Sequence, residues 1–409
     1  MSSAAFVRYP RRAVLGSGLG LGGALVLGCS SQPLGQKRGG ASASEGGAGG
    51  AGGMGSDPFA GGELLTDVPF AGEGDPPLEE PFNQGLDGRL YTDLSKLDDA
   101  HLLTPSAAFY IRTRYPDLLV PETLWKIRVL RAGQADVELV QSELEALATD
   151  QGAHLMECSG NARGAAFGLL SSADWTGVPL LTALADVPAP ADATAILVSG
   201  FDQHSRASAN STAGASWVFS LAELEQVGAF LATQMNGAPL LPDHGAPVRL
   251  LVPGWYGCTC IKWVNEISFV GPDAPATSQM LEFASRTMQN GAPTLARDYL
   301  PAEIDLAAMP TRIEKWQIDG KLVYRVVGIE WGGSAKAPAL EIRFGDGAWQ
   351  AVDKRSSATD VATWRLWEHA FRPPQVGSYS ITLRVPDASV RTRRLDSGYY
   401  LREVTIDEV

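Results

Sequence analysis

A cysteine between an apolar run and a glycine-containing turn is the first candidate for chemistry in this chain. Cys158 lies two residues before Gly160 and five before Arg163. A thiolate is a soft metal ligand, glycine lets the backbone approach closely, and a guanidinium can hold an oxyanion nearby. The segment therefore predicts anion redox chemistry at a metal. The alternative is that Cys158 is only a buried core residue.

A second segment contains several motifs in a row. It reads Asn-Gly-Ala-Pro-Leu at 236–240, Asp-His-Gly-Ala-Pro-Val-Arg at 243–249 and Val-Pro-Gly at 252–254, followed by Lys262-Trp263. Together with Cys-Ser-Gly-Asn-Ala-Arg at 158–163, these motifs resemble those of the sulfite oxidase family of molybdopterin enzymes, in the same order. Several motifs in one order are more specific than any one of them.

The resemblance implies roles for the matching residues. Cys158 is expected to bind molybdenum beside the dithiolene sulfurs of the pterin. Arg112, in Phe-Tyr-Ile-Arg, and Arg163 are expected to hold the substrate, because a guanidinium matches an oxyanion and stays charged near neutral pH. The residues expected to bind molybdopterin are His244, Arg249, Lys262 and His204. Considered by residue type alone, Arg112 could be a structural contact, His244 a turn histidine and His204 a surface residue.

Some positions depart from the family pattern. Arg114 stands where a histidine is common, and residues 280–286 lack the tyrosine expected near the metal. Tyr299 could replace that tyrosine only if the intervening loop is rearranged, and Arg402 is a poor match for a carboxy-terminal pocket arginine. These departures leave the identity of the substrate open.

The reaction implied by the resemblance is oxygen-atom transfer to or from a small oxyanion, most simply sulfite to sulfate, by an exported enzyme containing molybdenum and molybdopterin. The sequence has no CxxCH haem motif and no cysteine cluster for an iron-sulfur centre, so electrons would leave through an external partner such as cytochrome c. The alternatives are a periplasmic sulfoxide reductase of the same fold, a pterin-free binding or assembly protein, and a purely structural lipoprotein.

The remaining cysteines have other interpretations. Cys258 and Cys260 are too close in sequence for a relaxed disulfide, so buried packing is the preferred interpretation and a redox or metal role the alternative. Cys29 follows Val26-Leu27-Gly28, as at a lipoprotein processing site, and would then carry a lipid anchor.

The amino-terminal region predicts export. Residues 1–28 contain Arg11-Arg12 before an uncharged, glycine-rich apolar run that is short for a membrane span, as in a twin-arginine signal; a Sec signal is the alternative. Residues 29–81 are predicted to be a flexible Gly/Ala/Ser-rich linker, either a tether from a lipid anchor or a spacer. The predicted location is periplasmic or cell-envelope.

Length and composition predict at least two globular domains in 409 residues, of which 45% are hydrophobic. The net charge of -13 argues against nucleic-acid binding through a basic surface.

Residues 82–308 are predicted to form a mixed α+β molybdopterin-binding domain. Its strands are expected at 125–130, 154–157, 195–199 and 248–252, and its helices at 142–148 and 221–234. Ser142 is expected to cap the first of these helices.

Residues 309–409 predict an all-β immunoglobulin-like sandwich. Short strands are expected at 321–329, 339–344, 364–371, 379–385 and 401–406, with a hairpin turn at 345–347. The family resemblance implies that this domain forms a homodimer.

Overall fold

The computed structural model describes residues 58–120, 124–204, 208, 213–334, 337–356 and 363–409. The predicted signal, Cys29 and the linker up to residue 57 lie outside this part of the chain. Residues 56–409 form one compact unit. Across these described segments, no helix is long and apolar enough to cross a membrane.

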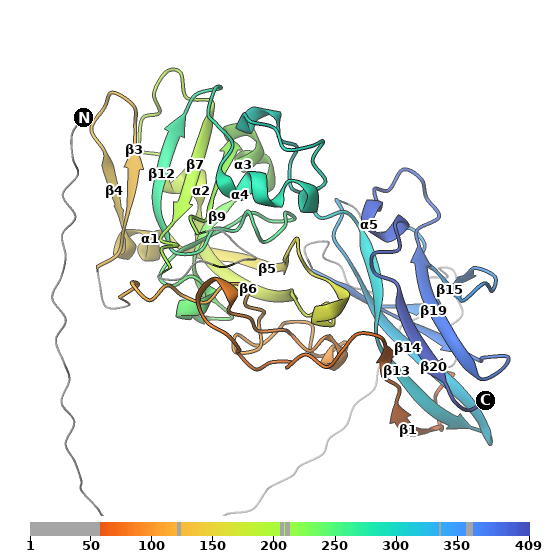
Figure 1. Ribbon diagram of the computed structural model, residues 1–409. Helices are drawn as coiled ribbons and strands as arrows, with labels where there is room; N and C mark the ends of the chain where they lie inside the picture. Colours follow the sequence, from red (N-terminus) through yellow and green to blue (C-terminus); the bar gives the residue numbers. More distant parts are fainter. Residues whose placement is uncertain (1–57, 121–123, 205–207, 209–212, 335–336, 357–362) are drawn as a thin grey trace, which may run out of the picture. The chain divides into compact units, whose positions relative to one another are not determined.

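Two five-stranded sheets make up the first half of the described chain (Figure 1). One has the order β10-β9-β6-β5, with β11 also paired to β9, and the other has the order β4-β3-β12-β7-β8. The bounds of these strands are β3 (Lys126–Leu130), β4 (Val137–Val140), β5 (Thr149–Glu157), β6 (Leu170–Pro179), β7 (Ala195–Gly200), β8 (Ser216–Ser220), β9 (Phe230–Met235), β10 (Ala238–Pro239), β11 (Arg249–Leu251) and β12 (Val264–Val270).

The helices of this half are short. They are α1 (Gln141–Leu147), α2 (Leu180–Ala183), α3 (Leu221–Val227) and α4 (Ser278–Phe283). One hydrophobic cluster takes side chains from both sheets, including Val129, Trp175, Val198 and Leu231. The two sheets therefore share a core, as expected for a mixed α+β domain.

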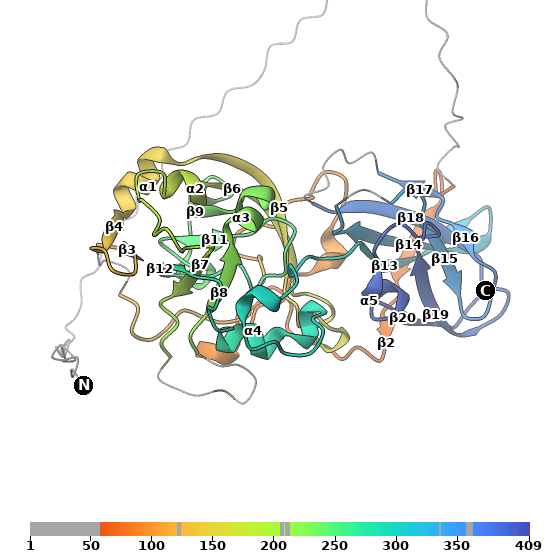
Figure 2. The ribbon, with the colours of Figure 1, turned by 90° about the horizontal axis from the view of Figure 1, so that it is seen from above.

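Two further five-stranded sheets form a β-sandwich, with the orders β1-β13-β14-β18-β17 and β16-β15-β19-β20-β2 (Figure 2). Their strands are β1 (Glu63–Asp67), β2 (Phe70–Ala71), β13 (Ala307–Ile318), β14 (Lys321–Trp331), β15 (Glu341–Phe344), β16 (Gln350–Ala351), β17 (Lys354–Arg355), β18 (Arg365–Phe371), β19 (Gly377–Arg384) and β20 (Arg402–Ile406), and helix α5 (Arg393–Asp396) precedes β20. The predicted fold class, a mixed α+β domain followed by a β-sandwich, is confirmed.

The predicted helix at 221–234 is wrong in its second half. Ser220 and Glu223 form a capping box that starts α3, and Gly228 ends it with a φ of 63°. Residues 230–235 instead form β9, which is buried and pairs with β6 and β11. Apolar spacing could not separate a helix from this strand, because both of its faces are buried and carry apolar residues, Phe230 and Ala232 on one face and Leu231 and Met235 on the other. Ser142 does not cap α1 either, since the cap position is Val140.

The predicted linker is wrong in its last part. β1 pairs with β13 and β2 pairs with β20, so residues 63–71 extend both sheets of the sandwich. The predicted domain boundary at 308/309 also falls inside β13. That strand tolerates Pro310 because its register shifts between Pro310 and Arg312, and such a bulge needs no amide from the proline.

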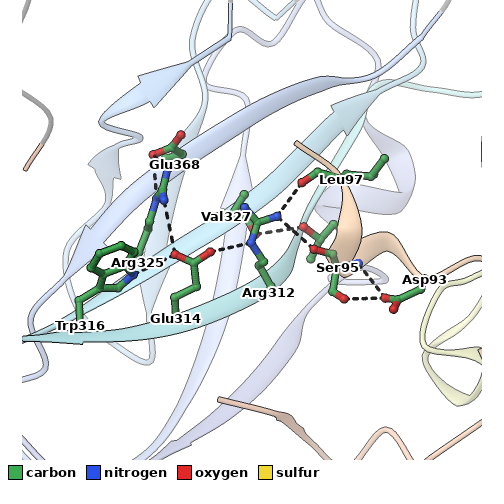
Figure 3. Close-up of polar contacts among 10 residues, drawn as sticks. Asp93, Ser95, Leu97, Arg312, Glu314, Trp316, Arg325, Val327 and Glu368 are labelled. Carbon is green, nitrogen blue, oxygen red and sulfur yellow. Dashed lines mark hydrogen bonds and ion pairs between the residues drawn. The ribbon is translucent and has the colours of Figure 1, made fainter. Parts of the chain in front are cut away.

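A polar network on β13 ties an early loop to the sandwich (Figure 3). Arg312 donates to the carbonyl oxygens of Ser95 at 3.1 Å and Leu97 at 2.6 Å, and to Glu314 at 2.7 Å. Burial raises the pKa of Glu314, but hydrogen bonds from Arg312 and Trp316 outweigh burial and hold the pKa below its ordinary value. The network gives residues 95–97 fixed partners on the sandwich.

A glycine in the sandwich provides a test of this packing. A Cβ at Gly328 would lie 2.2 Å from Cζ2 of the buried Trp367 and 2.3 Å from the Met309 carbonyl oxygen. We expect Gly328→Ala to lower the free energy of unfolding by about 1–3 kcal/mol through overpacking, measured by urea denaturation. Gly271→Ala is the control, because its Cβ would make only an ordinary 3.5 Å contact. Equal stability of the two variants would contradict this packing.

Candidate functional site

Cys158 directly follows β5 and is held by a tight turn. Its amide donates to the Leu169 carbonyl at 3.0 Å, and the Asn161 amide donates to the Cys158 carbonyl at 2.9 Å. The Asn161 side chain accepts from the Leu169 amide at 3.1 Å, and the Gly160 amide points at the sulfur at 3.4 Å. These bonds hold the turn in place around the sulfur. Cys158 itself is buried, with 5% of its surface exposed.

A cavity opens on the Cys158 side chain, with a volume of about 810 Å³ counting the part open to solvent. We call it the cysteine cavity. Its lining includes Tyr110, Arg112, Cys158, Asp202, Asp243, His244, Arg249, Cys258, Cys260, Lys262, Trp263 and Phe283. Five of the seven predicted site residues therefore line one cavity: Cys158, Arg112, His244, Arg249 and Lys262.

His244 is buried in this cavity and lies at the end of the 3-10 turn Pro242–His244. Its Nε2 lies 2.9 Å from the Ser106 carbonyl oxygen, which can only accept, so Nε2 carries the proton. Burial lowers the pKa of His244 to about 4. The ring is therefore neutral near pH 7, and Nδ1 is left as an acceptor.

Arg249 and Lys262 are cations that donate hydrogen bonds to backbone carbonyls. Arg249 is 4% exposed and donates to the carbonyls of His244 at 3.0 Å and Cys260 at 3.2 Å, while its Nε has no partner. Lys262 donates to the carbonyls of Thr113 and Asp243. Burial, with repulsion from Arg249, lowers the pKa of Lys262 to about 7. The buried Arg249 and the half-buried Lys262 have no carboxylate partner among the described residues, which suits an anionic ligand.

His204 lies beside this cavity but is not one of its lining residues. Its side chain is 2% exposed, Nε2 lies 2.5 Å from Asp202, and the ring meets Trp263 edge-on. Asp202 lines the cysteine cavity. His204 is therefore buried and could act on a ligand through Asp202.

Arg163 is not brought to the cavity. It begins the 3-10 turn Arg163–Ala165, and its Nη2 donates to the Leu401 carbonyl at 2.6 Å, with Glu403 at 3.9 Å from Nη1. The turn after Asn161 directs the side chain towards β20. The structure thus corrects the expectation that Arg163 lines the substrate pocket.

A second cavity is lined by the residues that follow Cys158, Ser159 and Gly160, and we call it the arginine pocket. Its lining includes Arg89, Tyr91, Arg112, Ser159, Gly160, Arg286, Arg394 and Tyr399, and contains no acidic residue. Arg112 lines both cavities. Burial, with repulsion from Arg112, lowers the pKa of Arg89 to about 10. A cluster of guanidinium groups of this kind is suited to an oxyanion.

The sequence interpretation missed most of the arginine pocket, including Arg286, Arg394 and Tyr399. Arg286 follows α4, and the other two lie in and after α5, at the far end of the chain. A tyrosine and a carboxy-terminal arginine thus line this pocket, at positions other than those that the resemblance suggested. Tyr299 lines a different cavity, and Arg402 is buried in an ion pair with Glu73. No local motif marks these residues, because only the tertiary fold brings them together.

A buried carboxylate joins the Cys158 turn to the sandwich. Glu157 is fully buried and accepts from Trp331 Nε1 at 2.9 Å and the Tyr400 hydroxyl at 2.9 Å. Arg394 lies 3.9 Å away and donates to the Ser159 carbonyl at 2.7 Å. Burial raises the pKa of Glu157, and Arg394 opposes this rise. The residue next to Cys158 is thus fixed by β14 and by the segment that contains α5.

The other cysteines that the structure describes, Cys258 and Cys260, are free thiols. Cys258 and Cys260 both line the cysteine cavity, and Cys260 Sγ accepts from the Val252 amide at 3.4 Å. Burial raises the pKa of both thiols, which agrees with a packing role. In the described ranges, no group of three or more His, Cys, Asp or Glu side chains could by itself hold a metal ion.

Comparisons with known proteins agree with this site. The model of the oxidoreductase molybdopterin binding domain matches residues 115–278. Mitochondrial sulfite oxidase of Macaca fascicularis is 24% identical over 352 residues, covering 80% of this chain and 61% of that protein. The Rattus norvegicus protein is 24% identical, covering 76% and 59%. This chain thus spans about three-fifths of the length of these relatives.

Two further similarities concern a shorter match and a solved structure. An NADPH nitrate reductase of Mycosarcoma maydis is 28% identical over 220 residues, covering 46% of this chain and 21% of that protein. The crystal structure of the sulfane dehydrogenase SoxCD from Paracoccus pantotrophus superposes with a TM-score of 0.57 at 14% identity, covering 87% of this chain and 96% of that chain. At this identity, the structural similarity establishes the fold alone.

The Glu157 network predicts a large effect on stability. Glu157→Leu would leave the buried Arg394 guanidinium without its carboxylate, and Trp331 and Tyr400 without their acceptor. We expect the free energy of unfolding to fall by about 3–5 kcal/mol, measured by urea denaturation. Glu157→Gln, which keeps an acceptor oxygen, should lose less. Glu403→Leu is the control, since Glu403 forms only an exposed ion pair at 3.9 Å. A loss in Glu157→Leu no larger than in this control would disprove the role of the network.

Proposed function

This chain belongs to the sulfite oxidase family of molybdopterin-binding oxidoreductases, and we propose that it transfers an oxygen atom to or from a small oxyanion, with oxidation of sulfite to sulfate as the leading reaction. One observation carries the proposal. The Cys158 sulfur faces a cavity lined by Arg249 and Lys262, and the next two residues of its turn line the arginine pocket. A metal ligand thus lies between an anionic-cofactor site and an anion pocket.

The residues of the cysteine cavity fit molybdopterin bound to molybdenum. The unpartnered Nε of Arg249 and the Nζ of the half-buried Lys262 suit the phosphate of the pterin, and His244 offers a neutral acceptor at Nδ1. Cys158 would hold the metal through its thiolate. When bound, the cofactor supplies the oxygen-atom and two-electron chemistry, and the protein supplies position and charge.

The arginine pocket suits an oxyanion substrate. Arg112 and Arg394 both line it, and both are fixed by bonds to backbone carbonyls, at Leu86 and Ser159. Guanidinium groups held in this way can orient the oxygens of sulfite without being reordered on binding. This pocket favours an anion over a neutral sulfoxide, so we place sulfoxide reduction second. A pterin-free or purely structural protein would have no need for this cluster of guanidinium groups beside Cys158.

The setting of the enzyme is part of the proposal. We propose that the protein is exported to the periplasm or cell envelope, with Cys29 as a lipid anchor, and that it works as a homodimer. The electrons from sulfite would pass to an external cytochrome c. Sequence motifs and the family resemblance support these assignments.

The role of Cys158 can be tested through metal content. We expect wild-type protein to contain about one molybdenum and one pterin per chain and to reduce ferricyanide with sulfite. Cys158→Ser should lose sulfite turnover and most of its molybdenum, because a hydroxyl is a poor substitute for a thiolate. Cys258→Ser is the matched control, a second thiol in the same cavity, and should keep both. Protein matured in its host without molybdenum would refute the enzyme assignment, and molybdenum without sulfite turnover would favour another substrate.

The lowered pKa of Lys262 predicts that cofactor binding depends on pH. Below about pH 7 Lys262 is protonated and attracts an anion, and above about pH 7 the proton is lost. The affinity for molybdopterin should therefore fall by at most roughly tenfold per pH unit from pH 7 to 9. The charged or titratable groups facing Lys262 are Arg112, Asp202, Asp243, His244 and Arg249. The pKa of His244, about 4, lies outside this window.

Lys262→Arg provides the control for this pH dependence, because arginine keeps its charge throughout the window. Its binding curve, measured as pterin retained after reconstitution at each pH, should be flatter than that of the wild type. Parallel slopes in the two proteins would rule out titration of Lys262 as the cause.

A further inference from the structure

Arg286 differs from the other arginines of the arginine pocket in its partners. Arg89 donates to the carbonyls of Leu86 and Gly88, and Arg394 to those of Ser159 and Arg286. Within the described part of the chain, the Arg286 guanidinium has neither a hydrogen bond nor an ion pair, and its side chain is exposed. Its positive charge is therefore available to a ligand.

The position of this guanidinium is close to the Cys158 sulfur. A Cβ placed on Gly160 would lie 3.7 Å from Arg286 Nη1 and 3.9 Å from Cys158 Sγ. The sum of these two distances is an upper limit on the separation of Nη1 and Sγ. Because residue 160 is glycine, it places no side chain of its own between them. An anion in the arginine pocket could thus contact Arg286 while remaining close to the sulfur.

The backbone that carries Arg286 is fixed to the same turn. Arg394 Nη2 donates to the Arg286 carbonyl at 2.7 Å and to the Ser159 carbonyl at 2.7 Å. The guanidinium carbon of Arg286 lies 5.1 Å from the centre of the Phe283 ring, which lines the cysteine cavity. The base of Arg286 is therefore held while its charged end remains unpaired, an arrangement that lowers the ordering cost of gripping a ligand.

We infer that Arg286 is a specificity-determining residue, which binds an outer oxygen of a doubly charged oxyanion seated in the arginine pocket. This inference rests on the proposed function and deepens it, because it names the charge class of the substrate. The pocket lining offers Arg89, Arg112 and Arg394 as fixed cations and no carboxylate. A fourth, uncompensated cation favours a dianion over a monoanion or a neutral molecule.

Sulfate is the probe for this inference, since it is a tetrahedral dianion and is not turned over by the wild type in the absence of a reductant. Its dissociation constant is measured by calorimetry at fixed ionic strength for wild type, Arg286→Gln, Arg286→Lys and Arg297→Gln. Arg297 is the matched control, an exposed arginine in the 3-10 turn Ala296–Asp298 that already pairs with Asp273 at 2.7 Å. Molybdenum content and sulfite KM and kcat are measured on the same samples.

We expect Arg286→Gln to weaken sulfate binding by about tenfold or more, which is typical of a lost charge-assisted hydrogen bond, and to raise the sulfite KM more than it lowers kcat. Arg286→Lys should recover part of the affinity, and Arg297→Gln should match wild type. Unchanged sulfate affinity in Arg286→Gln would overturn the inference even if the protein contains molybdenum and oxidises sulfite. Sulfate binding tests only the arginine pocket, which consists of protein side chains. The proposed function is tested separately, by the molybdenum content. If Arg286→Gln does not fold, Arg286→Lys is used in its place. A sulfate affinity several-fold weaker than that of the wild type would then support the inference, because lysine lacks the planar fork of arginine.

Discussion

The buried carboxylate of Glu157 is the constraint on which the site depends. A charged group without water must have partners, and Glu157 takes them from the sandwich, through Trp331 and Tyr400, and from Arg394. Because Cys158 is the next residue, these partners fix the start of its turn. Arg394 continues the constraint, since the same guanidinium holds the carbonyls of Ser159 and Arg286. The sandwich therefore has a direct part in shaping the site.

The two cavities differ in how the charges of their lining residues are balanced. In the cysteine cavity, Asp243 is paired with Arg114 at 3.0 Å, and Arg249 and Lys262 donate to carbonyl oxygens. The arginine pocket has no acid in its lining at all. A chain with a net charge of -13 has thus concentrated positive charge around one cysteine. Such local focusing draws anions to a site despite an acidic surface.

The strands were predictable where apolar and polar residues alternate along the chain, or where turn residues mark the ends of a strand. The strands at β3, β7, β18 and β20 follow from their alternation or β-branched and aromatic content, and their burial agrees with it. β9 was not predictable, because a strand buried on both faces has the same apolar content as a helix. β1 and β2 were hidden by the glycine-rich composition around them, and their pairing with β13 and β20 is non-local.

The sequence by itself identified four residues of the cysteine cavity. Cys158, His244, Arg249 and Lys262 lie in short motifs that can be read directly from the chain, and all four line that cavity. Only the tertiary structure decided the lining of the arginine pocket. It turned Arg163 away towards Leu401 and brought Arg286, Arg394 and Tyr399 to the Cys158 turn. The physical reason is that this pocket needs positive charge at a point in space, which residues from any part of the chain can supply without leaving a local pattern.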